Sequence, residues 1–257
     1  MPWSLLVAVM SAAVCGVASA YGPKVIARLP EPQERRPSSQ PELDGLALPA
    51  AADGDRGVLE PIDKTPYADL ARRPHLTSKL GITGGVVGAL IGWRLGWAAP
   101  LPAWVFLGWL GVILGYVDAQ TRLLPTRLIA PGYAVVIALL LLAAGLDGGT
   151  HQLAGAVLGW AVMGGFYFLM WFIYPKGLGY GDVRLSGLIG LALGYLGWGA
   201  LVTGLYSGFL LGGVGGGLLM LLRIVNRKHF PFGPFMLLGA LVGLIWGSSF
   251  AQWYGGG

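Results

Sequence analysis

Two aspartates, Asp118 and Asp182, lie at the edges of apolar segments, and together they could carry out acid–base chemistry. Of the 12 acidic residues only three lie beyond residue 80, and the third, Asp147, falls in a glycine-rich turn. A carboxyl group at membrane depth is energetically costly, so its presence there indicates a function. Two carboxyl groups that share one proton can hydrolyse an amide bond, because the ionised group activates water while the protonated group polarises the carbonyl.

Other roles for these aspartates are open at this point. Asp182 could cap the helix that follows it, which would stabilise that helix by about 1 kcal/mol. Asp118 could pair with Arg122, four residues later on the same helix face. A proton or ion relay in a transporter would also use paired intramembrane carboxyl groups. Spacing alone does not choose among these interpretations.

The rest of the chain is apolar enough to place both aspartates in a membrane. Of the 257 residues, 55% are hydrophobic and 11% are charged, whereas a soluble domain has about 25% charged residues. The net charge of +5 does not indicate nucleic acid, because the basic residues are spread over short loops. Apolar stretches without alternation, each near the roughly 20 residues that cross a bilayer, predict helices rather than a barrel. The predicted spans are residues 2–20, 81–97, 101–117, 128–146, 153–174, 185–199, 201–222 and 233–252.

These spans predict an all-α polytopic membrane protein with about eight transmembrane helices in three segments. Residues 1–21 form the first transmembrane helix, residues 22–80 a polar segment, and residues 81–257 a seven-helix transmembrane domain. The polar segment holds nine prolines and nine acidic residues, so we expect it to be largely disordered. Ala18-Ser19-Ala20 also fits a signal-peptidase site, but no basic residue precedes the apolar stretch, so we expect a retained helix.

The basic residues predict which side of the membrane each loop faces. Nine of the 17 Lys and Arg residues lie in segment 22–80. In an eight-helix topology the other basic residues, apart from Arg94, fall in loops on the same side of the membrane as this segment. Positively charged loops face the cytoplasm. The segment 22–80 is therefore predicted to be cytoplasmic, and Asp118 and Asp182 both lie at that face.

Glycine and cysteine usage bears on packing and on metal chemistry. The chain has 44 glycines, many of them inside the predicted spans, which predicts close helix–helix packing. Cys15 is the only cysteine, so an intramolecular disulfide and a cysteine-based zinc site are both excluded. We expect Cys15 to be a small packing residue. No cluster of metal ligands is apparent, so no metal and no cofactor are predicted.

Four stretches in order resemble the type IV prepilin peptidase family, whose members are Gly-x-Gly-Asp intramembrane aspartic peptidases. The stretch at residues 118–128 matches the first catalytic aspartate and a following proline, and the one beginning at residue 177 matches the second aspartate. The four stretches are YGPKVIARLP, DAQTRLLPTRL, GLGYGDVRLSGLIGLALGYLGW and HFPFGPFMLLGALVG. Gly-x-Gly-Asp alone is a weak motif, but all four stretches occur in the family's order and fit the predicted topology.

The resemblance implies an aspartic endopeptidase that removes the leader of type IV prepilins or pseudopilins, cutting after a glycine at the cytoplasmic face. Asp118 and Asp182 would be its catalytic residues. It implies a multi-pass protein of the bacterial inner membrane with prepilin substrates and lipid as partners. The motif glycines would let the backbone approach the substrate strand or adopt a positive φ. The motif and substrate-binding positions are Gly179, Gly181, Arg184, Pro125, Pro231, Gly233 and Pro234.

The chain also departs from the family pattern. Thr126 follows Pro125 where asparagine is common, and Arg184 stands where lysine is common. Many members carry two CxxC pairs that bind zinc, and such members also methylate the new N-terminus. This chain has no CxxC. We therefore expect peptidase activity and do not extend methyltransferase activity to it. The alternative hypothesis is a transporter or assembly factor that uses the paired aspartates without catalysis.

Overall fold

The computed structural model describes residues 2–30, 66–175, 178–216 and 231–255. The predicted disorder of segment 22–80 falls mainly on residues 31–65, which lie outside these ranges. The described elements are all helical, which confirms the predicted all-α fold. They are α1 (Pro2–Ala20), α2 (Gly22–Ala27), α3 (Tyr67–Ala71), α4 (Leu76–Leu95), α5 (Leu101–Thr121), α6 (Thr126–Asp147), α7 (Thr150–Ile173), α8 (Tyr180–Leu196), α9 (Trp198–Leu210), the π-helical turn η1 (Leu211–Gly215) and α11 (Gly233–Gly255).

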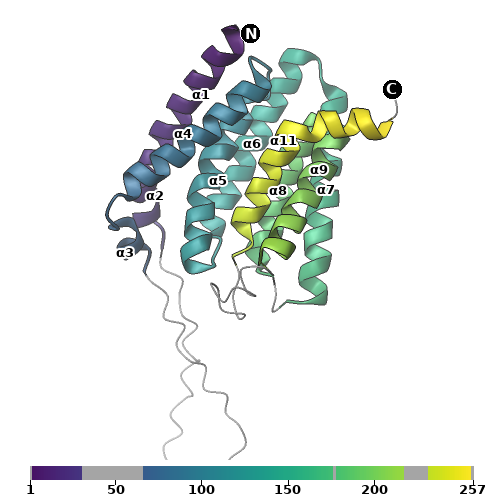
Figure 1. Cartoon of the computed structure of the whole chain (residues 1–257). Coiled ribbons are helices and arrows are strands. Elements are labelled where there is room, and N and C mark those ends of the chain that lie inside the picture. The colour runs from purple at the N-terminus through teal and green to yellow at the C-terminus, as the bar shows by residue number, and fades with distance from the viewer. Residues whose placement is uncertain (1, 31–65, 176–177, 217–230, 256–257) are drawn as a thin grey trace, which may run out of the picture.

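Seven of the described helical segments are long and apolar enough to cross a membrane, which makes this a multi-pass membrane protein. The helix that carries Asp182, α8, has 17 residues and falls just short of that length. Its residues 185–195 are all buried, so α8 is enclosed by protein for most of its length. The long helices alternate in direction, and α5 ends at the same end of the bundle at which α8 begins (Figure 1).

Glycines bring these helices together in three tightly packed pairs, α1 with α4, α7 with α8, and α9 with α11. A Cβ atom on Gly88 of α4 would lie 2.3 Å from the carbonyl oxygen of Ser11. A Cβ on Gly159 of α7 would lie 2.2 Å from the carbonyl oxygen of Gly190. Only glycine permits such backbone contact, and small residues are the usual means of close packing between membrane helices. This confirms the expected role of the glycines.

Both flanks of segment 22–80 are folded against the bundle. The short helices α2 and α3 contact each other and lie near the C-terminal end of α5. Their apolar side chains form a second small core with α4 and α5, and the guanidinium of Arg73 donates a hydrogen bond to Gln120 of α5. The buried members of this core are Ile26, Leu29, Tyr67, Leu70, Leu76, Leu80, Ile113 and Val117. This core supports the last turns of α5, immediately before Asp118.

Candidate active site

Asp118 lies in the last turn of α5 and is 3% exposed. Its Oδ2 atom accepts a hydrogen bond of 2.9 Å from the backbone N–H of Gly233, the first residue of α11. A Cβ on Gly233 would lie 2.8 Å from that oxygen, so the contact requires glycine. The free N–H groups at a helix N-terminus carry partial positive charge and bind carboxylates well. Asp118 is thus held by a helix far from it in sequence.

Asp182 lies in the first turn of α8, which begins five residues before the predicted span. Its Oδ2 atom accepts a hydrogen bond of 3.0 Å from the N–H of Gly179, and its own N–H donates to the Gly179 carbonyl oxygen, also at 3.0 Å. This reciprocal pairing caps the helix and explains the early start. Asp182 is 7% exposed, and its buried Oδ1 atom has no hydrogen-bond partner among the described residues. Capping therefore uses one carboxyl oxygen and leaves the other free.

Asp118 and Asp182 are close enough to interact electrostatically. They come from different helices, and α5, α8 and α11 pack against one another around them. The alternative partner of Asp118, Arg122, donates its backbone N–H to the Asp118 carbonyl oxygen at 2.8 Å, and its charge also interacts with the Asp118 carboxyl group. Arg122 itself is exposed and closes α5 in a left-handed conformation with φ of 56°.

The motif glycines differ from expectation in one respect. Gly179 has φ of −74° and ψ of 144°, an extended conformation that any residue can adopt, and Gly181 has no positive φ either. The expectation of a positive φ was therefore wrong, because the chain enters α8 through an ordinary extended N-cap. Gly181 is closely packed within the protein, since a Cβ there would lie 2.7 Å from the Cβ of Leu124. Gly181 thus lets the loop after α5 pack onto α8.

Arg184 links α8 to the start of α6. Its guanidinium donates a hydrogen bond to the hydroxyl of Thr126, the first residue of α6, and lies 4.7 Å from the ring centre of Tyr180. Its carbonyl oxygen accepts a hydrogen bond of 2.7 Å from the hydroxyl of Tyr133. Pro125 precedes α6 as its N-cap residue. The two departures from the family pattern, Thr126 and Arg184, are therefore in contact with each other.

Sequence reasoning missed Tyr167 of α7. This side chain is 1% exposed, and its hydroxyl has no hydrogen-bond partner among the described residues. Its ring meets that of Phe232 at 5.8 Å between centres, and the phenol lies within electrostatic range of Asp182. One tyrosine within an aromatic-rich helix gives no periodic signal, so the sequence could not single it out.

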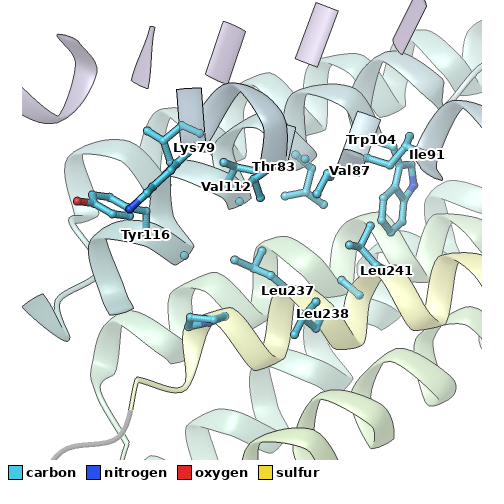
Figure 2. Close-up of a pocket in the computed structure, with 17 residues that line it drawn as sticks. Lys79, Thr83, Val87, Ile91, Trp104, Val112, Tyr116, Leu237, Leu238 and Leu241 are labelled. Carbon is cyan, nitrogen blue, oxygen red and sulfur yellow. The ribbon is translucent and has the colours of Figure 1, made fainter. Parts of the chain in front are cut away.

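A groove of about 370 Å³ runs between α4, α5 and α11. Lys79 and Tyr116 lie at one end of it, and Ile91 and Trp104 lie at the other (Figure 2). The lining between these ends is almost entirely apolar. Tyr116 is two residues from Asp118 on α5 and therefore faces another side of that helix, and neither aspartate lines the groove.

The motif prolines flank the contact between α11 and Asp118. Pro231 comes two residues before Gly233, and Pro234 lies in the first turn of α11, where proline is well accommodated. Pro234 also lines the groove at its Tyr116 end. Within the described ranges, no group of three or more His, Cys, Asp or Glu side chains could hold a metal ion.

Sequence comparison gives relatives with one shared description. A prepilin leader peptidase/N-methyltransferase of Aeromonas salmonicida (strain A449) is 33% identical over 171 residues, which is 60% of this chain and 54% of the relative. Proteins of the same description from Stutzerimonas stutzeri and Bacillus subtilis (strain 168) are 28% and 29% identical, over 52% and 58% of their lengths. The chain thus spans about half the length of these relatives. No protein-family model and no solved structure matches it. Over the part that these comparisons cover, the chain is similar to proteins described as prepilin leader peptidase/N-methyltransferase.

Proposed function

We propose that this protein is an aspartic endopeptidase that removes the leader peptide of type IV prepilins or pseudopilins. The observation that carries the proposal is the pair of buried carboxyl groups, Asp118 and Asp182, which different helices bring within electrostatic range. The relatives named as prepilin leader peptidases support the substrate class. The proposal covers leader cleavage alone and is not extended to methylation, because the chain has no CxxC pair.

The chemistry follows from two carboxyl groups that share one proton. The ionised group takes a proton from a water molecule, whose oxygen attacks the carbonyl carbon of the peptide bond, while the other group donates its proton to the carbonyl oxygen. Collapse of the tetrahedral intermediate breaks the C–N bond, and the leaving amine takes up a proton. The free Oδ1 atom of Asp182 is available for this exchange, since Oδ2 is engaged by the helix cap.

The groove could bind the apolar helix of a prepilin, which follows the cleaved peptide bond. Its lining along α4 runs from Lys79 to Ile91, which is about 18 Å at 1.5 Å per residue. Leu238, on its rim, is 50% exposed, so a helix could enter from the side. We propose that the substrate helix lies here with its first residues beside Asp118 and its leader outside the membrane, at the cytoplasmic face that the basic loops predict.

A cleavage assay tests the proposal. The protein would be co-expressed with a candidate prepilin, and the mature N-terminus determined by mass spectrometry for wild type, Asp182→Asn and Asp147→Asn. Asp147 is the matched control, because it is an exposed acidic residue that closes α6 away from the site. Wild type and Asp147→Asn should give a product that begins after the leader glycine, without an added methyl group. Asp182→Asn should lose at least about 10²–10⁴-fold in rate. Full cleavage by Asp182→Asn would exclude the mechanism and favour a non-catalytic role.

A further inference from the structure

A second cavity, of about 570 Å³, lies between α2 and the first turn of α6. Three basic residues line it: Lys24 on α2, Arg28 immediately after α2, and Arg127 on α6. The remaining lining residues include no acid. The proposed cleavage chemistry uses none of the three, so the cavity is a separate feature of the molecule.

The charges in this cavity are not neutralised within the described part of the chain. Lys24, Arg28 and Arg127 are all exposed. The ammonium group of Lys24 lies 5.0 Å from the ring centre of Tyr21, a contact that leaves its charge in place. The guanidinium groups of Arg28 and Arg127 have no hydrogen bond or ion pair with any described residue. Three like charges around one concavity repel one another unless an anion lies between them.

The cavity lies where a membrane helix ends. The apolar segment Trp3–Ala27 is long enough to cross a bilayer, and Lys24 and Arg28 lie at its end. Apolar residues lie beside the bases in the same cavity, namely Val25, Leu29 and Leu128. Tyr21, which also lines it, is 56% exposed, and exposed tyrosines are typical of the membrane–water interface. The lining thus changes from cationic to apolar over a few residues.

We infer that this cavity binds the headgroup of an anionic phospholipid. The phosphodiester lies among Lys24, Arg28 and Arg127, and the glycerol and first acyl carbons lie on the apolar residues beside them. Arginine in particular presents several N–H donors that match phosphate oxygens. Basic pockets between membrane helices at the cytoplasmic side are typical sites for anionic lipid, and each basic side chain there strengthens binding by a factor of about five.

Native mass spectrometry of the full-length protein in detergent tests the inference. Phosphatidylglycerol and phosphatidylcholine would be added at equal concentration, and inorganic phosphate would be added at 10 mM in a parallel sample. The variants would be Arg127→Gln, the triple variant Lys24→Gln/Arg28→Gln/Arg127→Gln, and the control Arg72→Gln. Arg72 is an exposed base that follows α3 and does not line the cavity. Thermal unfolding of each variant without lipid would establish that it is folded.

Wild type should retain phosphatidylglycerol in preference to phosphatidylcholine. Arg127→Gln should bind it about fivefold and the triple variant about a hundredfold more weakly, whereas Arg72→Gln should bind like wild type. Equal retention of both lipids, or equal binding by the triple variant, would overturn the inference. Displacement of the lipid by inorganic phosphate would show a site for free phosphate instead, which also overturns it. None of these outcomes depends on peptidase activity.

Discussion

The backbone N–H of Gly233 donates a hydrogen bond of 2.9 Å to the carboxylate of Asp118, across 115 residues of chain. This hydrogen bond joins α11 to Asp118, one of the two proposed catalytic residues. Because α11 also forms one wall of the groove, this bond fixes the carboxyl group relative to the proposed substrate site. Under the proposed function, this hydrogen bond would connect the substrate site to a catalytic carboxyl group.

Gly233→Ala should inactivate the protein without unfolding it. The new methyl group would lie 2.8 Å from the Asp118 Oδ2 atom, so either the carboxyl group or the start of α11 must move. A displacement of about 1 Å at a reacting group can lower the rate by about a hundredfold. The measurement is kcat/KM for prepilin cleavage beside the melting temperature. Gly145→Ala is the control, because a Cβ there meets nothing within 4 Å, and an equal loss in both variants would contradict the prediction.

Thr83→Trp should weaken binding of a full-length prepilin. Thr83 lines the groove, and an indole there would occupy the space proposed for the substrate helix. Excluding one apolar substrate side chain from the groove removes about 1.5–3 kcal/mol of binding free energy. KM should therefore rise by tenfold or more while kcat changes little.

Ile82→Trp is the matched control for the groove. Ile82 is the neighbouring residue on α4, is 69% exposed and does not line the groove. If both variants cleave like wild type, the groove proposal fails and the peptidase proposal stands. Photo-crosslinking from position 83 adds an independent readout. Capture of lipid alone in the presence of prepilin would also count against the groove as the substrate site.

Gly159→Ala should destabilise the bundle. Its Cβ would lie 2.2 Å from the carbonyl oxygen of Gly190, so α7 and α8 must separate. Overpacking of this kind lowers the free energy of unfolding by about 1–3 kcal/mol. Unfolding by denaturant in detergent would measure it. The control is Gly165 on the same helix, where a Cβ meets nothing within 4 Å. Gly165→Ala should unfold at the same denaturant concentration as wild type or at a higher one.

If Thr126 and Arg184 stabilise the fold through their contact, the effects of mutating them on the free energy of unfolding should not be additive. Thr126→Val and Arg184→Gln each remove the hydrogen bond between α6 and α8, so the double variant should lose less stability than the two single losses combined. Both residues lie near the surface, so a coupling of about 0.2–1 kcal/mol is expected. Strictly additive effects in a double-mutant cycle would show that the two side chains act separately.

Hydropathy was sufficient to predict the long helices and to place Asp118 and Asp182 at one end of the bundle, because both depend on local composition and on chain direction. Hydropathy could not predict the hydrogen bond between Gly233 and Asp118. Periodicity describes neighbours a few residues apart, whereas this hydrogen bond joins α5 to α11 and depends on how three helices pack.

Local capping chemistry explains where the predicted boundaries of the site were inaccurate. Asp182 was expected at the start of its helix and lies in the first turn of α8, but the predicted span began later, at residue 185. The helix begins at Tyr180 because the Asp182 carboxylate accepts the Gly179 N–H. The composition of segment 22–80 likewise concealed α2, whose few apolar residues fold only because α4 and α5 provide a surface for them.

The burial of α8 has a consequence for lipid dependence. A 17-residue helix is about 26 Å long, shorter than a hydrocarbon layer of about 30 Å. Helices in contact with lipid adjust to such a mismatch by tilting or by deforming the bilayer around them. Residues 185–195 of α8 contact protein instead, so its depth is set by its neighbours. A change in bilayer thickness therefore acts first on the outer helices, including α4 at the groove, and reaches Asp182 only through them.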